Sequence, residues 1–225
     1  MAQWADWRWQ LAHRLRSLDD FARLLDLTPD EIVGLSNGRR FRVGVTPYFA
    51  SLMDKRDPAC PLRRQLIPTA RETASCPGGM VDSLGEDAHS PVPGLVHRYP
   101  DRVLMLVTNQ CASYCRFCTR SRVVGDSHGH FGSTTFDGQL AYIASTPQVR
   151  DVLISGGDPL MLSAHVLEGL LRRLRAIPQV RCIGTSVIPE NEAATALYLG
   201  LGFVDNKWAK DASSDERYLM LDFPE

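Results

Sequence analysis

The chain has 225 residues, of which 44% are hydrophobic and 23% charged, and its formal net charge is −1. This balance gives no strongly basic surface for a nucleic acid or an anionic membrane, and no run of 18 apolar residues predicts a membrane span. The opening residues MAQWADWRWQ lack the apolar segment of a secretory signal, so we expect a cytoplasmic protein with reduced cysteines.

Residues 1 to 54 predict a helical region. Apolar residues recur there at steps of three and four, as on one face of an amphipathic helix, and we expect that face to pack in a core. They are Trp4, Trp7, Leu11, Leu15 and Leu18. In the stretch LTPDEIVGLSNG, Thr28 can cap a second helix with Pro29 in its first turn. A third, short helix is expected after Pro47.

Residues 55 to 100 predict an extended, irregular connector. Seven prolines and the pair Gly78-Gly79 interrupt this segment, so regular structure is not expected in it. Cys60 and Cys76 lie here without a ligand-like spacing between them. We expect both cysteines to act as small hydrophobic residues.

From residue 101 onward, apolar strands alternate with amphipathic helices. The predicted strands are residues 102–108, 149–155 and 179–186, and the predicted helices are residues 134–146 and 163–177. This order predicts parallel βαβ units with right-handed crossovers, and therefore an α/β core. Ligands of such sheets bind at the carboxyl ends of the strands, so the loops 109–120 and 155–160 are the candidate site.

The stretch CASYCRFC places Cys111, Cys115 and Cys118 in the spacing C-x3-C-x2-C. A structural zinc site takes four ligands, whereas three thiolates on one loop suit a cubane iron–sulfur cluster that keeps one iron open. His128 or His130 could instead complete a zinc site. A zinc-stabilised, non-catalytic binding module is therefore an alternative interpretation of the same cysteines.

Two further features accompany the cysteines. Arg116, Arg120 and Arg122 would offset the negative charge of a thiolate-bound cluster and could hold anionic groups of a substrate. The second predicted strand ends in SGGDP, residues 155–159, where bare glycine backbone can approach a ligand closely.

These motifs together resemble the radical S-adenosylmethionine superfamily. Longer stretches resemble the lysine 2,3-aminomutase family over about residues 4 to 182, which is only the first part of such an enzyme. They are WADWRWQL, TPYF, PVPGLVHRYPDRVLMLVTNQCASYCRFCTRSRVVG and DVLISGGDPLMLS. The resemblance implies a truncated radical-SAM-type (β/α) barrel with parallel strands at residues 101–184. It would follow the helical region 1–54 and the connector 55–100, and a tail, residues 185–225, would come last.

The resemblance also implies cofactors and a reaction. The three cysteines would hold a [4Fe–4S] cluster, and S-adenosylmethionine would bind its open iron. An electron from a donor such as flavodoxin or ferredoxin would then release a 5′-deoxyadenosyl radical. In the family this radical starts the migration of an amino group on lysine or a related amino acid, with the help of pyridoxal phosphate.

Site residues follow from the same resemblance, position by position. Phe117 would lie near the adenine, and Arg120 would hold the carboxylate of the amino acid. The methionine end of S-adenosylmethionine would be lined by Ser155, Gly156, Gly157 and Asp158. The region around pyridoxal phosphate would include Arg98, Tyr99 and Arg102.

The chain departs from the family in its lysines. Its three lysines, Lys55, Lys207 and Lys210, have no counterpart in the family's motifs, so no lysine can be assigned to pyridoxal phosphate.

The tail departs from the family as well. It resembles the last motif of GNAT acetyltransferases, in which a tyrosine can serve as general acid. The matching residues are Asn191, Ala194, Leu197, Tyr198, Gly202 and Phe203. An acetyltransferase fragment is thus one alternative, and a helix with two strands that complete the core is another. We expect a joint near residues 182–186, and either the tail or a second copy in a homo-oligomer would cover the open edge of the sheet.

Overall fold

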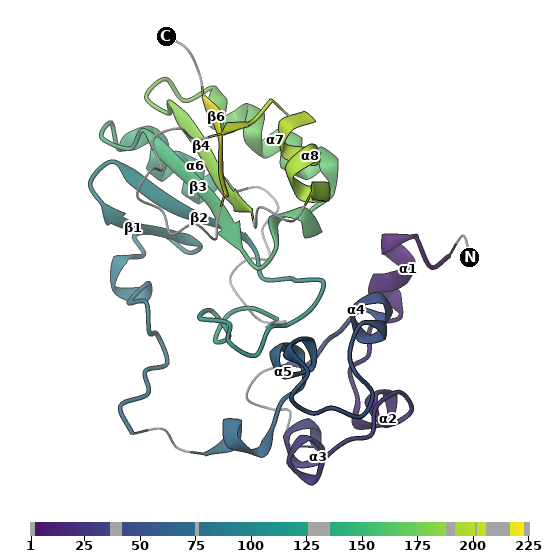
Figure 1. The fold of residues 1–225 in the computed structure, drawn as a ribbon. Coiled ribbons are helices and arrows are strands. Elements are labelled where there is room, and N and C mark those ends of the chain that lie inside the picture. The colour runs from purple at the N-terminus through teal and green to yellow at the C-terminus, as the bar shows by residue number, and fades with distance from the viewer. Residues whose placement is uncertain are drawn as a thin grey trace. The chain divides into compact units, whose positions relative to one another are not determined.

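The computed structural model describes residues 3–36, 42–74, 77–125, 136–187, 192–200, 202–205 and 217–222 (Figure 1). Its contacts divide the chain into two compact units. The helical unit comprises residues 1–84 and 110–127, and the sheet unit comprises residues 85–109 and 128–225. The four-part division expected from the sequence stays a prediction.

The helical unit is built from short helices. They are α1 (Trp7–Ala12), α2 (Leu18–Ala22), α3 (Pro29–Ser36), α4 (Pro47–Ser51), α5 (Pro61–Leu66) and the 3-10 helix η1 (Ala70–Thr73). The predicted helical region is confirmed by α1 to α4. The expectation of an irregular connector is wrong at α5 and η1. Pro61 stands at the first position of α5, where a proline favours a helix because its missing N–H would have no partner there.

Side-chain caps fix where these helices begin. Ser17 and Asp20 form a capping box at α2, and Thr46 accepts a hydrogen bond from the N–H of Phe49 at α4. At α3, the Thr28 N–H donates to Glu31 at 2.8 Å and the Glu31 N–H donates to the Thr28 hydroxyl at 3.3 Å. The capping signals in the sequence thus correspond to real helix starts.

The core of the helical unit contains apolar residues from several of its segments, and an ion pair lies buried in the same unit. The buried apolar residues are Leu15, Phe21, Leu25, Val45, Ala50, Met53, Leu66 and Ile67. Arg63 on α5 is completely buried and donates from Nε and Nη2 to the two carboxylate oxygens of Glu31, each at 2.7 Å. Burial alone would raise the pKa of Glu31, but the hydrogen bonds from Arg63 and Thr28 outweigh it and hold that pKa below its usual value.

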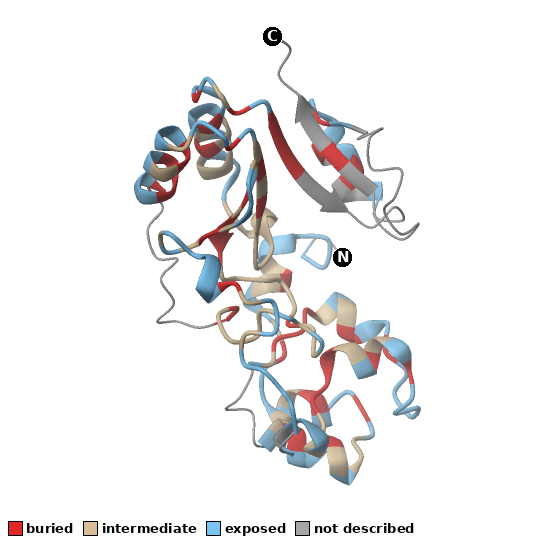
Figure 2. Cartoon of the chain, turned by 90° about the vertical axis from the view of Figure 1, so that its left-hand side faces the viewer, coloured by how far each residue is buried: buried red, intermediate tan, exposed pale blue. Residues whose placement is uncertain are grey.

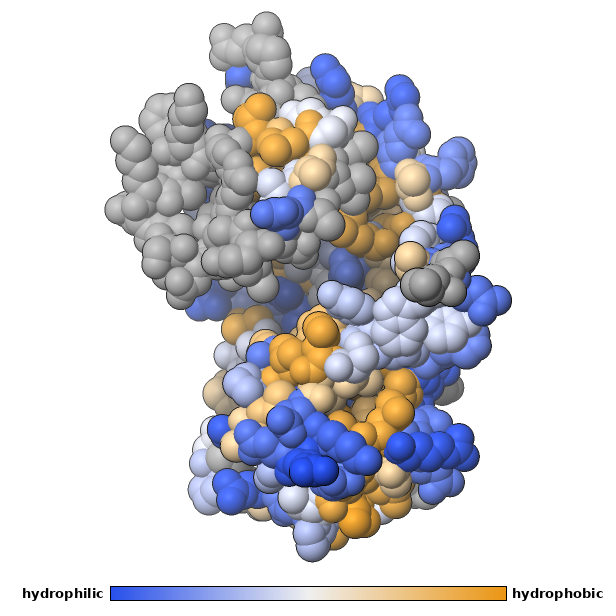
Figure 3. Space-filling view, turned by 45° about the vertical axis from the view of Figure 1, so that its right-hand side comes forward, coloured by the Kyte–Doolittle hydropathy of each residue, from blue (hydrophilic) through white to orange (hydrophobic). Residues whose placement is uncertain are grey.

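Of the stripe expected to pack in a core, Leu15 does so, whereas the two tryptophans do not. Trp4 and Trp7 are 44% and 58% exposed. Gln10 is buried instead, because its amide donates to the Trp4 carbonyl and accepts from the N–H of Tyr48 at the start of α4. Figure 3 shows hydrophobic side chains interspersed with hydrophilic ones on the face that it draws. Among the residues that the structure describes, no helix is long and apolar enough to cross a membrane.

The sheet unit holds one six-stranded sheet in the order β1-β2-β3-β4-β6-β5. The strands are β1 (Leu95–Tyr99), β2 (Arg102–Thr108), β3 (Asp151–Gly156), β4 (Cys182–Val187), β5 (Val204–Asp205) and β6 (Arg217–Asp222). The pairs β2–β3 and β3–β4 are parallel, and the other pairs are antiparallel. The predicted α/β class and its three parallel strands are confirmed. The described strands form an open sheet, and β1 lies where the irregular connector was expected.

Two crossover helices, α6 (Asp137–Ser145) and α7 (Ala164–Arg175), cover one face of this sheet. Alternate residues of the parallel strands point to that face, which follows from the two-residue period of a strand. The strands contribute Val103, Met105, Val107, Val152, Ile154 and Ile183, and the helices contribute Leu140, Ile143, Leu170 and Leu174. Figure 2 shows the strands of the sheet with buried stretches in red and intermediate ones in tan.

The tail is part of the sheet unit. All six residues of β6 pair with β4, so the tail covers the edge that the sequence analysis left open. The expected joint at residues 182–186 lies inside β4, which runs continuously between its two neighbours. The helix α8 (Glu192–Gly200) carries Tyr198, which is buried beside Phe203 at a ring-centroid distance of 5.3 Å. Asn191, the first residue of the acetyltransferase-like pattern, lies outside the described residues.

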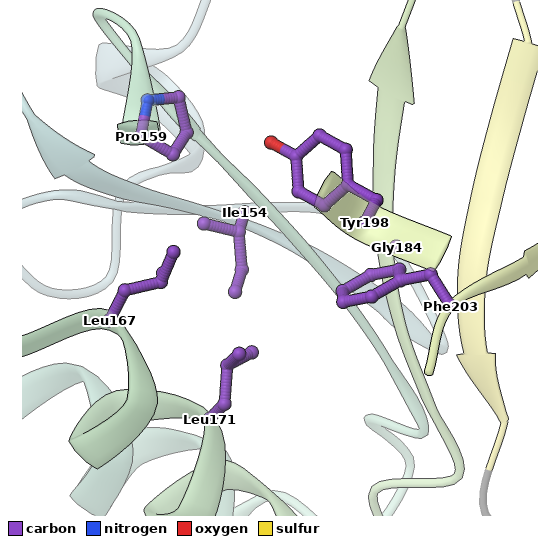
Figure 4. A pocket seen from close by; sticks show the side chains of 7 residues that line it. All are labelled: Ile154, Pro159, Leu167, Leu171, Gly184, Tyr198 and Phe203. Atoms are coloured by element: carbon purple, nitrogen blue, oxygen red, sulfur yellow. The ribbon is translucent and has the colours of Figure 1, made fainter. Parts of the chain in front are cut away.

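Figure 4 shows the small pocket that this packing leaves between the tail and the core of the sheet unit. Its lining consists of Ile154, Pro159, Leu167, Leu171, Gly184, Tyr198 and Phe203. The lining side chains are almost all apolar. Such a lining suits a gap left by imperfect packing better than a binding site for a charged acyl carrier. In this structure the tail completes a hydrophobic core.

Candidate functional site

The three cysteines lie on residues 110–125, here called the cysteine loop, which follows β2 and belongs to the helical unit. Cys111, Cys115 and Cys118 are free thiols of intermediate burial. The N–H of Cys118 donates to the carbonyl of Cys115 at 3.1 Å, so a tight turn separates these two cysteines. Phe117, inside that turn, is 69% exposed.

Backbone hydrogen bonds attach the cysteine loop to the helical unit. The Tyr114 N–H donates to the Gly44 carbonyl at 3.0 Å, and the Arg116 N–H donates to the Gln65 carbonyl at 2.7 Å. The buried ring of Tyr114 lies against Gly44, where an added Cβ would come within 3.1 Å of it. The loop therefore packs closely on the segments around α4 and α5.

Side chains add further attachments at both ends of the motif. The guanidinium of Arg14 donates to the carbonyl of Cys111 at 2.8 Å. The hydroxyl of Ser113 accepts from the N–H of Thr46 at 3.3 Å. Cys115 itself packs against the core of the helical unit. The helical unit thus acts as the support of the cysteine loop, a role that the sequence analysis did not assign to it.

Arg116 and Arg122, which are close to the cysteines in sequence, have acidic partners. Arg116 makes a bidentate ion pair with Glu72, and Arg122 lies 3.3 Å from Asp82. Carboxylates of the same unit engage these two side chains, and the expectation that they hold anionic groups of a substrate stays a prediction. Arg120 is half-buried in the loop.

The thiols of the cysteine loop have the donor chemistry of a metal site but not its placement. Burial, together with the nearby Cys118, raises the pKa of the Cys115 thiol. Among the described residues, no three His, Cys, Asp or Glu side chains are gathered closely enough to hold a metal ion. The donor set on the loop fits an iron–sulfur cluster chemically, while its three sulfurs are not gathered here. His128 and His130, the alternative zinc ligands, lie outside the described residues.

The glycine turn, residues 155–158, follows β3 in the sheet unit. Gly156 pairs with Thr108, the last residue of β2, and the N–H of Gly157 donates to the Thr108 carbonyl at 2.6 Å. Gly156 has φ +130°, and a Cβ there would lie 2.3 Å from that carbonyl oxygen. Only glycine fits this position, so the turn brings bare backbone to the carboxyl edge of the sheet.

The aspartate of the glycine turn fixes the segment that follows. Asp158 accepts a hydrogen bond from the N–H of Leu160 at 3.0 Å and so caps the 3-10 helix η3 (Pro159–Met161). Burial raises the pKa of Asp158. Ser155, Gly156, Gly157 and Asp158 are all of intermediate burial, as a contact surface for a ligand requires.

Arg98, Tyr99 and Arg102 lie at the other end of the sheet. Tyr99 is 61% exposed at the end of β1, and Arg102 pairs with Asp151 at 2.9 Å where β2 and β3 begin. Thr108 is six residues further along β2, or roughly 20 Å at the rise of a strand. The structure does not bring these three residues together with the glycine turn.

The partners that hold the cysteine loop were not predicted from the sequence. Arg14, Gly44, Gln65 and Glu72 have no motif of their own, and Glu72 is a single acid 44 residues before the arginine it binds. No local signal in the sequence identifies such a long-range contact.

Comparison with known proteins identifies the family. No protein-family model matches the chain. The L-lysine 2,3-aminomutase of Bacillus subtilis is 47% identical over 182 residues, which cover 80% of this chain and 39% of that protein. The matched part of this chain belongs to the lysine 2,3-aminomutase family. The predicted resemblance to that family is therefore confirmed.

Further members of the family agree with this assignment. The L-lysine 2,3-aminomutase of Clostridium subterminale is 45% identical over 183 residues, which cover 81% of this chain and 44% of that protein. The glutamate 2,3-aminomutase of Clostridioides difficile is 35% identical over 178 residues, which cover 79% of this chain and 42% of that protein. The chain thus spans less than half the length of each of these relatives. Their names describe isomerases that act on amino acids.

Proposed function

We propose that this chain binds a [4Fe–4S] cluster at Cys111, Cys115 and Cys118 and uses S-adenosylmethionine for radical chemistry on an amino acid. The observation that carries the proposal is the 47% identity over 182 residues with an L-lysine 2,3-aminomutase. Three free thiols on one supported loop give it a chemical basis, because three thiolates leave one iron of a cubane open.

The residues of the chain take the following roles in this proposal. The three thiols would hold the cluster, which when bound and reduced would supply the electron that cleaves S-adenosylmethionine. The exposed ring of Phe117 offers a surface for the adenine. The polar and bare backbone groups of the glycine turn contact the methionine end, and Arg120 holds the carboxylate of the amino acid.

Pyridoxal phosphate does not fit the residues present. Lys55 is the one lysine in the described part of the chain, and it lies on the surface of the helical unit, 3.8 Å from Asp26. Lys207 and Lys210 lie outside the described residues. No step of the proposal uses pyridoxal phosphate, and the assignment of Arg98, Tyr99 and Arg102 to it stays a prediction from the resemblance.

The substrate proposed is lysine or a related amino acid, and the electron donor is a small redox protein such as flavodoxin or ferredoxin. Relatives named for lysine and for glutamate both match this chain, so the two amino acids are the natural pair to compare. Arg120 would bind the carboxylate common to both.

Anaerobic reconstitution with iron and sulfide tests the first step. We expect a brown protein with about four iron atoms per chain. The variant Cys115→Ala should lose that iron, while Cys60→Ala, which removes a thiol outside the loop, should keep it. A colourless protein that holds one zinc ion would contradict the proposal and favour the zinc-stabilised module.

Product analysis tests the second step. With a chemical reductant or reduced flavodoxin, the reconstituted protein should convert S-adenosylmethionine to 5′-deoxyadenosine, faster when lysine or glutamate is present. The β-amino acid product is sought in the same samples, with and without added pyridoxal phosphate. A reconstituted cluster that never yields 5′-deoxyadenosine would refute the radical chemistry.

A further inference from the structure

We infer that Glu72 and Arg116 form a positioning pair that fixes the turn between Cys115 and Cys118, two of the three proposed cluster ligands. The inference rests on the proposed function, because it concerns the same cluster site. The place of Arg116 between two cysteines suggests that it offsets the charge of a cluster or holds a substrate. The inference gives it a different role. Arg116 would act through the loop rather than on the substrate or the cofactor.

The side chain of Arg116 is held at three points. Its Nε donates to Glu72 Oε1 at 2.9 Å, its Nη2 donates to Glu72 Oε2, and its Nη1 donates to the carbonyl of Arg42 at 3.0 Å. The side chain is only 8% exposed. A bidentate arginine–carboxylate pair fixes direction as well as distance, which a single-point ion pair does not.

The backbone of the same residue is held as well. The N–H of Arg116 donates to the carbonyl of Gln65 at the end of α5, at 2.7 Å. Arg116 directly follows Cys115 and stands two positions before Cys118. Fixing its backbone and its side chain together therefore limits how the turn between these two cysteines can rotate.

Glu72 belongs to a segment that is itself closely packed. It lies in η1, and its N–H donates to the carbonyl of Thr69 at 3.1 Å. The chain just before η1 packs against α3, because a Cβ at Gly34 would lie 2.4 Å from the Pro68 carbonyl oxygen. The carboxylate that binds Arg116 is thus presented by a segment in close contact with a helix.

The ion pair also balances charge beside the thiols. An arginine fully paired with a carboxylate adds little net positive potential at the cysteines, so attraction of an anionic ligand is not its main effect. Arg122 also has an acidic neighbour, Asp82, at 3.3 Å. The geometry therefore favours mechanical positioning of the turn over electrostatic recruitment.

The test compares cluster retention in four variants: Glu72→Gln, Arg116→Gln, the double variant and Arg116→Lys. Each protein is reconstituted anaerobically, and the rate at which a chelator removes iron is measured. Each single variant should lose iron about tenfold faster than the wild type, as expected for one lost charge-assisted pair. The double variant should be no faster than either single one, because both remove the same interaction. Arg116→Lys should not restore slow loss, since an ammonium group cannot bind both oxygens in parallel.

Controls separate positioning from general stability. Glu168→Gln breaks an exposed pair with Arg172 on α7 and should leave iron loss unchanged. The thermal midpoint of each metal-free variant is measured beside its iron loss. If iron loss rises only in proportion to a fall in that midpoint, the role is structural and the inference is overturned.

The remaining outcomes decide between the inference and the proposed function. A wild-type protein that takes up no cluster overturns the proposed function and the inference with it. A wild-type cluster that Glu72→Gln retains equally well overturns the inference alone. Additive losses in the double variant would show that the two residues act independently, which also overturns the pair.

Discussion

Removing the buried arginine of the helical unit should destabilise that unit strongly. In Arg63→Met, the apolar stem of the new side chain fills part of the space, but the guanidinium is lost. Glu31 then keeps only its contacts with Thr28 in a buried site. The carbonyl of Asp26 also loses the hydrogen bond from Arg63 Nη2, at 2.8 Å, and the carbonyl of Lys55 loses the one from Nη1, at 3.0 Å.

Breaking a buried ion pair by removing one partner costs about 3–5 kcal/mol, because the other charge stays buried without compensation. We expect a loss of this size in the free energy of unfolding of Arg63→Met. Urea unfolding followed by tryptophan fluorescence measures it, since Trp4, Trp7 and Trp9 all lie in the helical unit. Cluster uptake should fall too, because Arg63 fixes α5, whose Gln65 carbonyl holds the cysteine loop.

Lys55→Met is the matched control. Lys55 and Asp26 form an ion pair of 3.8 Å with both side chains about 60% exposed, and such surface pairs contribute less than about 1 kcal/mol. The reasoning is refuted if Arg63→Met loses no more stability than Lys55→Met. It is also refuted if Glu31→Leu combined with Arg63→Met is less stable than Arg63→Met alone, since removing both charges should relieve the cost.

The pKa of Glu31 in the folded protein lies below its ordinary value of 4.5. Its stabilising effect is therefore complete above about pH 4.5 and is lost as the pH falls through the folded pKa. In Glu31→Gln, the free energy of unfolding should consequently fall less steeply with decreasing pH than in the wild type. Gly156→Ala should destabilise the sheet unit by at least about 1–3 kcal/mol in urea unfolding, whereas Gly169→Ala, in open space on α7, should gain up to about 1 kcal/mol. Gly44→Val should displace the Tyr114 ring and lower iron uptake during reconstitution, and uptake equal to the wild type would contradict the packing role of Gly44.

The parallel strands of the sheet were predictable because each sequence pattern that indicates them is local. The apolar run at residues 102–108 and the alternation of strands with amphipathic helices both predict parallel βαβ units without any knowledge of distant contacts. The strand β1 was missed because prolines on both sides of it favoured an irregular connector. Its structure depends on pairing with β2, and a partner strand overrides local propensity.

The candidate site was predictable only in part, for the same physical reason. The cysteine spacing and the glycine turn are local patterns, so the sequence itself predicts which groups would meet a ligand. The support of the loop consists of hydrogen bonds across large separations, such as Arg14 to Cys111 over 97 residues and Arg116 to Glu72 over 44. Neither contact leaves a periodic or spaced signal.

The attachment of the cysteine loop changes what the first 84 residues are for. The sequence alone predicts only a helical region before the sheet. In the structure this segment supplies the carbonyls of Gly44 and Gln65 and the carboxylate of Glu72, all of which hold the loop. Ligand loops need supporting groups that fix their geometry before binding, because ordering a loose loop costs conformational entropy at the moment of binding. The helical unit is therefore best understood as the support of the candidate cluster site, and changes in its core should reach the cysteines through α5.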